Sequence, residues 1–265
     1  MSAQWVSLEE AAALIQDGMT LALGGLMLYR RPVAFVRALL ERDVRPSSLN
    51  LLCFTAGYES DLLVGAGCVA TMHSCYIGLE AFGFAPMFTQ SAQDGSLAVV
   101  EETEASIVLG IQAALAGVPS LPSRAWLGTD MLMIRQDVKT SFDPYTSEEV
   151  VAFPAIHCDV AVIHALAADR AGNILLNNNL GIDKELVLLA DTVIVTVEEQ
   201  VDSLTQHDGF ILPEILIDYL VVSPRGAWPT SCYPSYSVDG HELLRYVDMC
   251  TQGLFDTYLQ TVSKL

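Results

Sequence analysis

One glutamate stands where a carboxylate could act on a reacting substrate. Glu104 follows an apolar segment, predicted to be a strand over residues 96–100, and comes at the start of a helix predicted over 103–116. A carboxylate at a strand exit can attack a carbonyl carbon or take up a proton. A carboxylate in the first turn of a helix can also serve only to interact with the helix dipole. Both roles are open for Glu104.

Glycine turns could stabilise the oxyanion that such an attack creates. Gly24 and Gly25 end the first apolar strand of the chain, and Gly78 lies in a second glycine-containing segment over residues 74–86. Because glycine has no side chain, its backbone N–H can approach a ligand closely. Ordinary tight turns need the same residues. We predict that these three glycines line a substrate site, together with Glu80 of the second segment.

Two consecutive arginines, Arg30 and Arg31, follow the first glycine pair. A guanidinium group matches a carboxylate with two parallel hydrogen bonds, so either residue could hold a substrate carboxylate. An ion pair that is solvated or lies at a subunit interface is the alternative. We predict both arginines as substrate-binding candidates.

Histidines and cysteines show no metal-binding pattern. His157 and His164 are seven residues apart in a strand region and would face opposite sides, and His164 is typical of a core histidine. The six cysteines lack CxxC spacing and lie mostly in apolar segments, which is typical of buried free thiols in a reducing compartment. Glu198 and Glu199 end another strand and could approach a cleft, although a surface position is favoured. We predict no metal site.

The elements that must position these residues alternate between strands and helices. Ser7 and Glu10 form a capping-box pattern, and Pro32 opens a helix after the glycine turn. Further strands are predicted over 48–54, 69–77, 160–165 and 192–197. The last two are continuous apolar runs, typical of parallel strands buried on both faces.

The polar stretch over 135–150 is predicted to be a surface excursion. We predict an α/β fold with an open, mostly parallel sheet flanked by helices, in a single domain over residues 1–265.

Charge and hydropathy exclude several classes of function. The chain has 265 residues and a formal net charge of −19, which disfavours a nucleic-acid partner. No stretch approaches the roughly 20 uninterrupted apolar residues of a membrane span. The first residues lack the basic and apolar segments of a signal peptide. We therefore expect a cytoplasmic protein without a membrane partner.

Seven segments, in order along the chain, resemble the A subunits of family I coenzyme A transferases, the group that includes glutaconate coenzyme A-transferase. The first has Asp-Gly, an apolar strand, Gly-Gly and Pro32, with Leu26 where the family has Phe and Arg30 where it has a final Gly. The other segments cover residues 74–86, 101–104, 122–130, 154–173, 192–199 and 226–232. Trp228, in the last segment, stands where relatives usually carry His.

The resemblance implies a two-subunit enzyme that moves coenzyme A between an acyl-coenzyme A and a small carboxylic acid, with dicarboxylic acids among the candidates. In this family the nucleophilic glutamate belongs to a B chain of related fold, in a Ser-Glu-Asn-Gly motif that this chain lacks. The active site lies near the interface, so a B subunit is the expected partner. Coenzyme A carries phosphates, which a charge of −19 repels unless basic residues gather locally or the partner supplies them.

Other reactions remain open on the same fold. Some relatives are ring-opening hydrolases whose acting glutamate resembles Glu104, and others decarboxylate an acyl-coenzyme A. A non-catalytic subunit that only shapes the partner's pocket, or an isolated metabolite-binding protein, are further alternatives. The sequence names neither the acid nor the stoichiometry.

Overall fold

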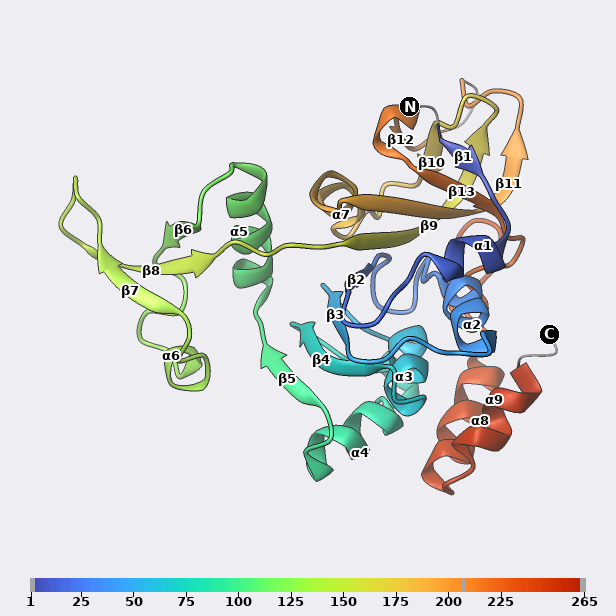
Figure 1. Cartoon of the computed structure of the whole chain (residues 1–265), viewed down its shortest axis with the longest axis horizontal. Helices are drawn as coiled ribbons and strands as arrows, with labels where there is room; N and C mark the ends of the chain where they lie inside the picture. The colour runs from blue at the N-terminus through green and yellow to red at the C-terminus, as the bar shows by residue number, and fades with distance from the viewer. Residues whose placement is uncertain (1–2, 206–207, 263–265) are drawn as a thin grey trace.

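The chain forms a large, mostly parallel β-sheet flanked by helices and a second, small antiparallel sheet (Figure 1). The computed structural model describes residues 3–205 and 208–262. The parallel strands of the large sheet, in spatial order, are β1 (Gln4–Trp5), β13 (Tyr219–Val222), β11 (Thr192–Val201), β9 (Val160–Asp169), β2 (Thr20–Leu23), β3 (Leu49–Cys53), β4 (Val69–Ser74) and β5 (Ala98–Glu101). Two further strands, β10 (Ile174–Leu176) and β12 (Phe210–Leu212), pair antiparallel beside β9. The predicted fold class is confirmed.

Helices cover both faces of the large sheet. The helices are α1 (Leu8–Ala13), α2 (Val33–Glu41), α3 (Tyr58–Gly65), α4 (Pro86–Asp94), α5 (Glu104–Leu115), α6 (Met131–Ile134), α7 (Asp183–Leu189), α8 (Gly240–Thr251) and α9 (Phe255–Val262). Successive side chains of a strand point to opposite faces. Leu21 therefore packs in the core with α1, α2, α3, α8 and α9, whereas Ala22 packs with α5 and α7. Burial on both faces explains the continuous apolar runs of β9 and β11.

Several local signals in the sequence have the predicted structure. Ser7 and Glu10 make both hydrogen bonds of the capping box at the start of α1. Pro32 immediately precedes the first residue of α2. Near the C-terminus, Gly253 has a φ of +74° and separates α8 from α9.

Residues 118–155 form an arm that projects beside β5 (Figure 1). The arm contains the small sheet of β6 (Ser120–Ser123), β8 (Glu149–Pro154) and β7 (Lys139–Phe142), together with α6. It has its own small core, which includes Trp126 and Phe153. The stretch 135–150 is largely exposed, as predicted, but it carries β7 and the start of β8, which the sequence pattern did not reveal. The single-domain assignment stays a prediction.

The strands β2 to β5 run parallel, so their carboxyl ends meet at one edge of the sheet. The glycine turn follows β2 at this edge, and Glu102 to Glu104 follow β5. Ligands of open α/β sheets bind outside the carboxyl ends of strands, so this edge is where a site is expected. Among the described residues, no helix has the length and apolar character needed to cross a membrane.

Candidate functional site

The glycine pair after β2 has a structural reason at each position. Gly25 has a φ of +83°, and a Cβ atom there would lie 2.6 Å from the carbonyl oxygen of Arg30. A Cβ atom on Gly24 would lie 2.5 Å from Oδ1 of Asp183. Glycine is therefore required both by the turn and by the close approach of a carboxylate.

The N–H groups of the three predicted oxyanion donors are all bonded within the chain. The bonds run from Gly24 to the Val162 oxygen (2.9 Å), from Gly25 to Asp183 Oδ1 (2.7 Å) and from Gly78 to the Ala56 oxygen (3.2 Å). A substrate oxyanion would have to displace these acceptors. The substrate-binding role of the glycines stays a prediction, and these contacts give it no support.

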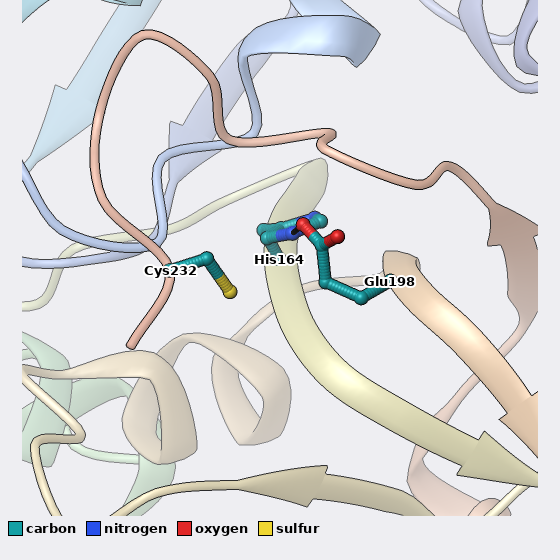
Figure 2. A group of neighbouring side chains, drawn as sticks. All are labelled: His164, Glu198 and Cys232. Atoms are coloured by element: carbon teal, nitrogen blue, oxygen red, sulfur yellow. Dashed lines mark hydrogen bonds and ion pairs between the residues drawn. The ribbon is translucent and has the colours of Figure 1, made fainter. Parts of the chain in front are cut away.

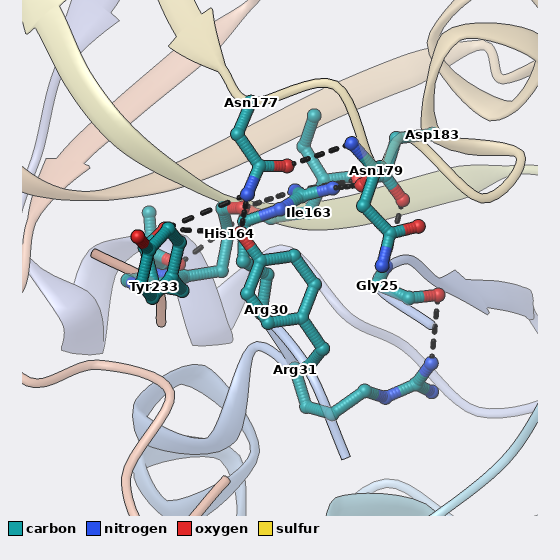
Figure 3. Close-up of polar contacts among 11 residues, drawn as sticks. Gly25, Arg30, Arg31, Ile163, His164, Asn177, Asn179, Asp183 and Tyr233 are labelled. Carbon is teal, nitrogen blue, oxygen red and sulfur yellow. Dashed lines mark hydrogen bonds and ion pairs between the residues drawn. The ribbon is translucent and has the colours of Figure 1, made fainter. Parts of the chain in front are cut away.

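Arg30 lies in the core of the protein, and its polar contacts are shown in Figure 3. Its side chain is fully buried, and Nη1 lies 2.7 Å from Asp183 Oδ2. The same nitrogen donates to the His164 carbonyl, and Nη2 donates to the Asn179 carbonyl. Arg30 thus links the turn after β2 to β9 and to the segment before α7.

Arg31 makes a second buried ion pair. Its Nη2 lies 2.6 Å from Glu59 Oε1, and both side chains are fully buried. Its Nη1 donates to the carbonyl oxygens of Thr55 and Gly25. Neither arginine exposes a guanidinium to a substrate in this structure. The ion-pair alternative therefore describes them better, although both pairs are buried within the chain and are neither solvated nor at an interface.

Glu104 lies at the predicted strand exit, as the first residue of α5. The residue is exposed, and its carboxylate makes no hydrogen bond or ion pair with the described part of the chain. Cys75 comes directly after β4. Burial is the main cause that raises the pKa of the Cys75 thiol to about 11, and the negative charge of Glu104 is the second. A carboxylate that is exposed and unpaired beside a neighbouring strand end is available to a substrate.

Glu102, two residues earlier, is buried and paired. Its Oε1 accepts from Nη1 of Arg135 at 2.6 Å and lies 3.7 Å from Nδ1 of His73. Burial raises the pKa of Glu102, but the interactions with His73, Ser106 and Arg135 outweigh burial, so the pKa lies below its ordinary value. No local pattern links these residues, because Arg135 lies on the arm, 33 positions from Glu102.

The arm is tied to the start of α5 by a second contact. Nε1 of Trp126 donates to Oγ1 of Thr103 at 2.8 Å, and Thr103 is the N-cap of α5. The Arg135 guanidinium lies 6.0 Å from the centre of the Trp126 ring. We call the Arg135–Glu102 and Trp126–Thr103 contacts the latch. The latch holds the segment that carries Glu104.

A cavity of about 400 Å³ lies between the large sheet and the arm. His73 and Glu102 line the cavity from the sheet side. Arg135 lines it from the arm, and His157 lines it from the segment between β8 and β9. His157 is therefore at a cavity, whereas His164 is in the core. Glu80 is elsewhere, exposed at the start of a short 3₁₀ helix with a φ of +52°.

His164, Glu198 and Cys232 form a buried polar cluster (Figure 2). His164 Nε2 is 2.8 Å from Glu198 Oε1, and Nδ1 is 2.8 Å from Thr196 Oγ1. Burial lowers the pKa of His164, although the Glu198 carboxylate opposes that effect. His164 is thus the satisfied core histidine that the sequence predicted.

Glu198 departs from its predicted surface position. Its side chain is only 11% exposed, and its carboxylate also accepts from Tyr236 Oη (2.5 Å) and from the Arg225 N–H (2.7 Å). Because these partners come from distant segments, the strand pattern alone did not indicate them. Glu199 is exposed.

The ligand-type atoms of His164, Glu198 and Cys232 lie within 4.8 Å of one another, a spacing that a shared metal ion would also allow. The His164 nitrogens and the Glu198 oxygens already take part in hydrogen bonds. The absence of a metal site stays a prediction. All six cysteines are free, and all but Cys75 are buried, as expected.

Known proteins resemble this chain over nearly all of its length. Residues 6–223 match the sequence profile of the family described as Coenzyme A transferase. The chain is 31% identical over 242 residues to the A subunit of the 3-oxoadipate CoA-transferase of Pseudomonas knackmussii, over 89% of this chain and 85% of that protein. It is 32% identical over 247 residues to the IpdA component of the cholesterol ring-cleaving hydrolase of Rhodococcus jostii, over 88% of this chain and 82% of that protein. A chain in the crystal structure of a cysteine-to-serine variant of the decarboxylase AibA/AibB is 32% identical, with a TM-score of 0.92 over the full length of both chains.

Proposed function

This chain belongs to the coenzyme A transferase family, and we propose that it is the A component of a two-subunit enzyme that transfers coenzyme A between an acyl-coenzyme A and a small carboxylic acid. The observation that carries the proposal is its similarity, over most of both chains, to the A component of a transferase. The chain also lacks the Ser-Glu-Asn-Gly motif of the nucleophile, so a B subunit of related fold has to supply that glutamate.

The proposed transfer consists of acyl substitutions at two carbonyl carbons. The partner's glutamate attacks the thioester carbonyl, and coenzyme A leaves as a thiolate, which leaves an acyl–glutamyl anhydride. The thiolate then attacks the glutamyl carbonyl, releases the first acid and forms an enzyme thioester. The acceptor acid repeats the sequence in reverse and leaves with coenzyme A. Each step forms a tetrahedral oxyanion that preorganised donors can stabilise.

Glu104 has a proposed place in this reaction. Its exposed carboxylate stands at the sheet edge where strands β4 and β5 end. There it can accept a hydrogen bond from the substrate, or take a proton from a water molecule that attacks a carbonyl carbon. The latch holds the side chains of the two residues that come before it, Glu102 and Thr103.

The same unpaired carboxylate favours a second candidate, a coenzyme A thioester hydrolase or ring-opening hydrolase. In that reaction Glu104 takes a proton from water, and the hydroxide equivalent attacks the substrate carbonyl. The 32% identity to a component of a ring-cleaving hydrolase supports this candidate. Decarboxylation is a third reaction known on a chain of this length and fold.

The deciding experiment is mass spectrometry of the two-subunit complex after incubation with an acyl-coenzyme A and reduction with borohydride. A partner glutamate reduced to its alcohol would establish the enzyme thioester and therefore transfer. Free coenzyme A or carbon dioxide accumulating without a covalent intermediate would exclude transfer and favour hydrolysis or decarboxylation.

Glu104→Gln tests the role of this chain in turnover. The substitution keeps the size of the side chain and removes the proton acceptor, so we expect kcat to fall by about 100-fold or more. Glu101→Gln is the matched control, because Glu101 is an exposed glutamate at the end of the same strand. Equal activities of the two variants would favour a subunit that only shapes the partner's pocket.

A further inference from the structure

A shallow hollow lies at the outer end of the large sheet, where β4 and β5 end beside α4 (Figure 1). β5 is the last strand in the order of the sheet, and within the described residues no strand pairs with its outer side. We call this depression of about 200 Å³ the edge hollow. It has room for about six groups of the size of a water molecule, so it suits one leucine or phenylalanine side chain. Its lining is mostly apolar and includes Met72, Tyr76, Ile77, Phe88 and Val99.

The apolar lining of the edge hollow is open to solvent. Met72 and Val99 are register partners on β4 and β5, so their side chains share one face of the sheet, and Phe88 of α4 lines the hollow beside them. Val99 is 46% exposed, and Tyr76 is 36% exposed. Lysine or proline commonly protects an edge strand from contact with other chains, and β5 carries neither. An open edge with apolar side chains indicates a surface that another chain covers.

This part of the molecule has no lysine or arginine of its own. Neither residue occurs between Arg45 and Arg124, a range that includes β3, β4, β5 and the helices α3, α4 and α5. Glu101 lines the edge hollow, Glu80 lies between β4 and α4, and Asp94 ends α4. All three of these residues are exposed. The surface around the edge hollow is therefore apolar and negatively charged.

Arginines on the neighbouring elements do not neutralise these carboxylates. Arg135 reaches the end of β5 from the arm, where it donates to the Glu101 carbonyl, but its charge is paired with Glu102 and Asp137. Arg245 of α8, the helix that packs against α4, is paired with Glu242. A partner that binds here therefore gains from bringing lysine or arginine side chains of its own.

Charge also distinguishes between two kinds of partner. A second copy of this chain in a two-fold dimer would place the same surface against itself. Exposed carboxylates would then face one another across an apolar contact, which costs free energy because like charges repel and lose hydration. A different chain with a basic surface has no such cost. The edge hollow therefore suits a partner of different sequence.

The edge hollow is close to the residue that the proposed reaction uses. Glu104 follows Glu101 by three residues, so their Cα atoms are at most about 11 Å apart even in a fully extended chain. A subunit that docks at the hollow is therefore near the segment that carries Glu104. The proposed function requires such a subunit, because this chain lacks the Ser-Glu-Asn-Gly motif.

We propose that the edge hollow is a docking site for the B subunit, which inserts one apolar side chain between Tyr76, Phe88 and Val99 and places basic side chains opposite the carboxylates around it. The proposal rests on the proposed function, since the B subunit is the partner which that function requires. Apolar anchors in small, well-packed pockets contribute most of the binding energy of an interface. The charges around such an anchor chiefly steer association.

The test is the affinity of the full chain for the purified B subunit of the same two-subunit enzyme, measured by sedimentation velocity and calorimetric titration. Val99→Arg fills the hollow and turns a positive charge towards a basic partner, so we expect the dissociation constant to rise by about 30-fold or more. Val99→Ile keeps the apolar wall and should bind as the unmodified chain does. Val44→Arg is the matched control, because Val44 is a 77% exposed valine outside the hollow. Tyr76→Ala removes another wall of the hollow and should weaken binding by about 10-fold, which keeps the test available where folding of Val99→Arg fails.

Salt and charge reversal test the electrostatic part of the proposal. The dissociation constant should rise by about 10-fold or more between about 0.05 M and about 0.5 M sodium chloride, because salt screens the charges that face each other. Glu80→Lys should lower the association rate by about 5-fold, whereas Asp43→Lys, an exposed residue beside Val44, should leave it unchanged. An association that neither salt nor Glu80→Lys weakens would overturn the assignment of a basic partner.

The outcomes separate this proposal from the proposed function. An enzyme thioester in a complex whose affinity survives folded Val99→Arg and Tyr76→Ala would overturn the docking site and keep transfer. A complex that these variants disrupt, and that forms no covalent intermediate, would keep the docking site and exclude transfer. A chain that binds no B subunit, or that instead forms a two-fold dimer through the hollow, would overturn the docking site.

Amide hydrogen exchange gives a readout that needs no substitution. Assembly with the B subunit should slow exchange over residues 76–78 and 97–101, which border the edge hollow. Residues 42–45, which lie outside the hollow, should exchange at the same rate in the free chain and in the complex. Unchanged exchange over 76–78 and 97–101 in the saturated complex would place the interface elsewhere and overturn the proposal.

Discussion

At the scale of single residues, Glu102 and Glu104 lie two positions apart in very different surroundings. Glu102 is buried against Arg135, while Glu104 is exposed and unpaired. A carboxylate already neutralised by a guanidinium is a poor proton acceptor, because its pKa is lowered. This difference supports a positioning role for Glu102 and the proposed role of Glu104 at the substrate.

The buried pair of Arg30 and Asp183 should dominate the stability of the glycine turn. Asp183→Asn leaves the Arg30 charge buried without its counter-ion, so we expect the free energy of unfolding to fall by about 3–5 kcal/mol. Denaturant unfolding followed by circular dichroism measures this loss.

Asp202→Asn is the control for that substitution, because Asp202 pairs with Arg170 at the exposed surface. Its expected effect is below about 1 kcal/mol. Similar losses in the two variants would contradict the importance assigned to the buried pair. Activity should follow folding in Asp183→Asn, since neither member of the pair is exposed to a substrate.

At the scale of secondary-structure elements, the latch connects the arm to the start of α5. Arg135→Gln removes the ion pair with Glu102 and should loosen the junction between β5 and α5. We expect faster amide hydrogen exchange over residues 101–106 and a lower kcat, with KM changed less. Arg135→Lys should recover part of the activity, because it keeps the charge but loses the paired donors to Asp137.

Arg124→Gln is the matched control on the same arm. Arg124 makes an exposed ion pair with Glu148 at 3.4 Å and has no contact with the latch residues. Its exchange pattern over residues 101–106 should match that of the unmodified chain. Unchanged exchange in Arg135→Gln would show that the arm does not position Glu104.

Helices α3, α4 and α8 meet at one buried carboxyl group. Asp61 accepts from the N–H groups of Phe88 (2.6 Å) and Met87 (3.2 Å) and from Tyr246 Oη (2.5 Å). Burial raises the pKa of Asp61 to about 6, because these hydrogen bonds only partly offset the loss of hydration. The folded chain therefore holds a proton that the unfolded chain has already lost near pH 4.

This group makes stability depend on pH in a defined direction. Between about pH 4 and pH 6 the folded state binds more protons, so the free energy of unfolding falls as pH rises, by up to about 1.4 kcal/mol per pH unit. Above about pH 6 the contribution levels off. Urea unfolding over this range should give a flatter profile for Asp61→Asn than for the unmodified chain, even though the variant is less stable throughout. Parallel profiles would assign the pH dependence to other groups.

The fold was predictable where burial leaves a pattern in the sequence. The strands β9 and β11 are continuous apolar runs because both of their faces are covered. The capping box of α1 was predictable because its two residues are three positions apart. Strand β7 was not predictable, since all of its residues are exposed and it exists through pairing with β8. Contacts within the site are predictable only when they are local in the sequence. Glu104 is placed by the strand and helix on either side of it, whereas the Arg30–Asp183 contact joins residues 153 positions apart.

At the scale of the whole molecule, the chain carries an unpaired carboxylate at an open sheet edge but lacks the nucleophile motif of its family. The exposed apolar residues Met133, Ile134 and Phe142 lie on the arm. These features fit the proposed A component, whose chemistry needs a second subunit.

Reconstitution tests this division of labour between the two subunits. The chain alone should show no transfer of coenzyme A, and adding a B subunit of the family should restore turnover with a saturation point at one B chain per A chain. Glu104→Gln should still assemble with that subunit, as sedimentation velocity would show, and yet lower kcat, because the substitution keeps the size of the side chain and removes only its charge. Turnover by the chain alone would place the nucleophile here and make the absence of Ser-Glu-Asn-Gly irrelevant.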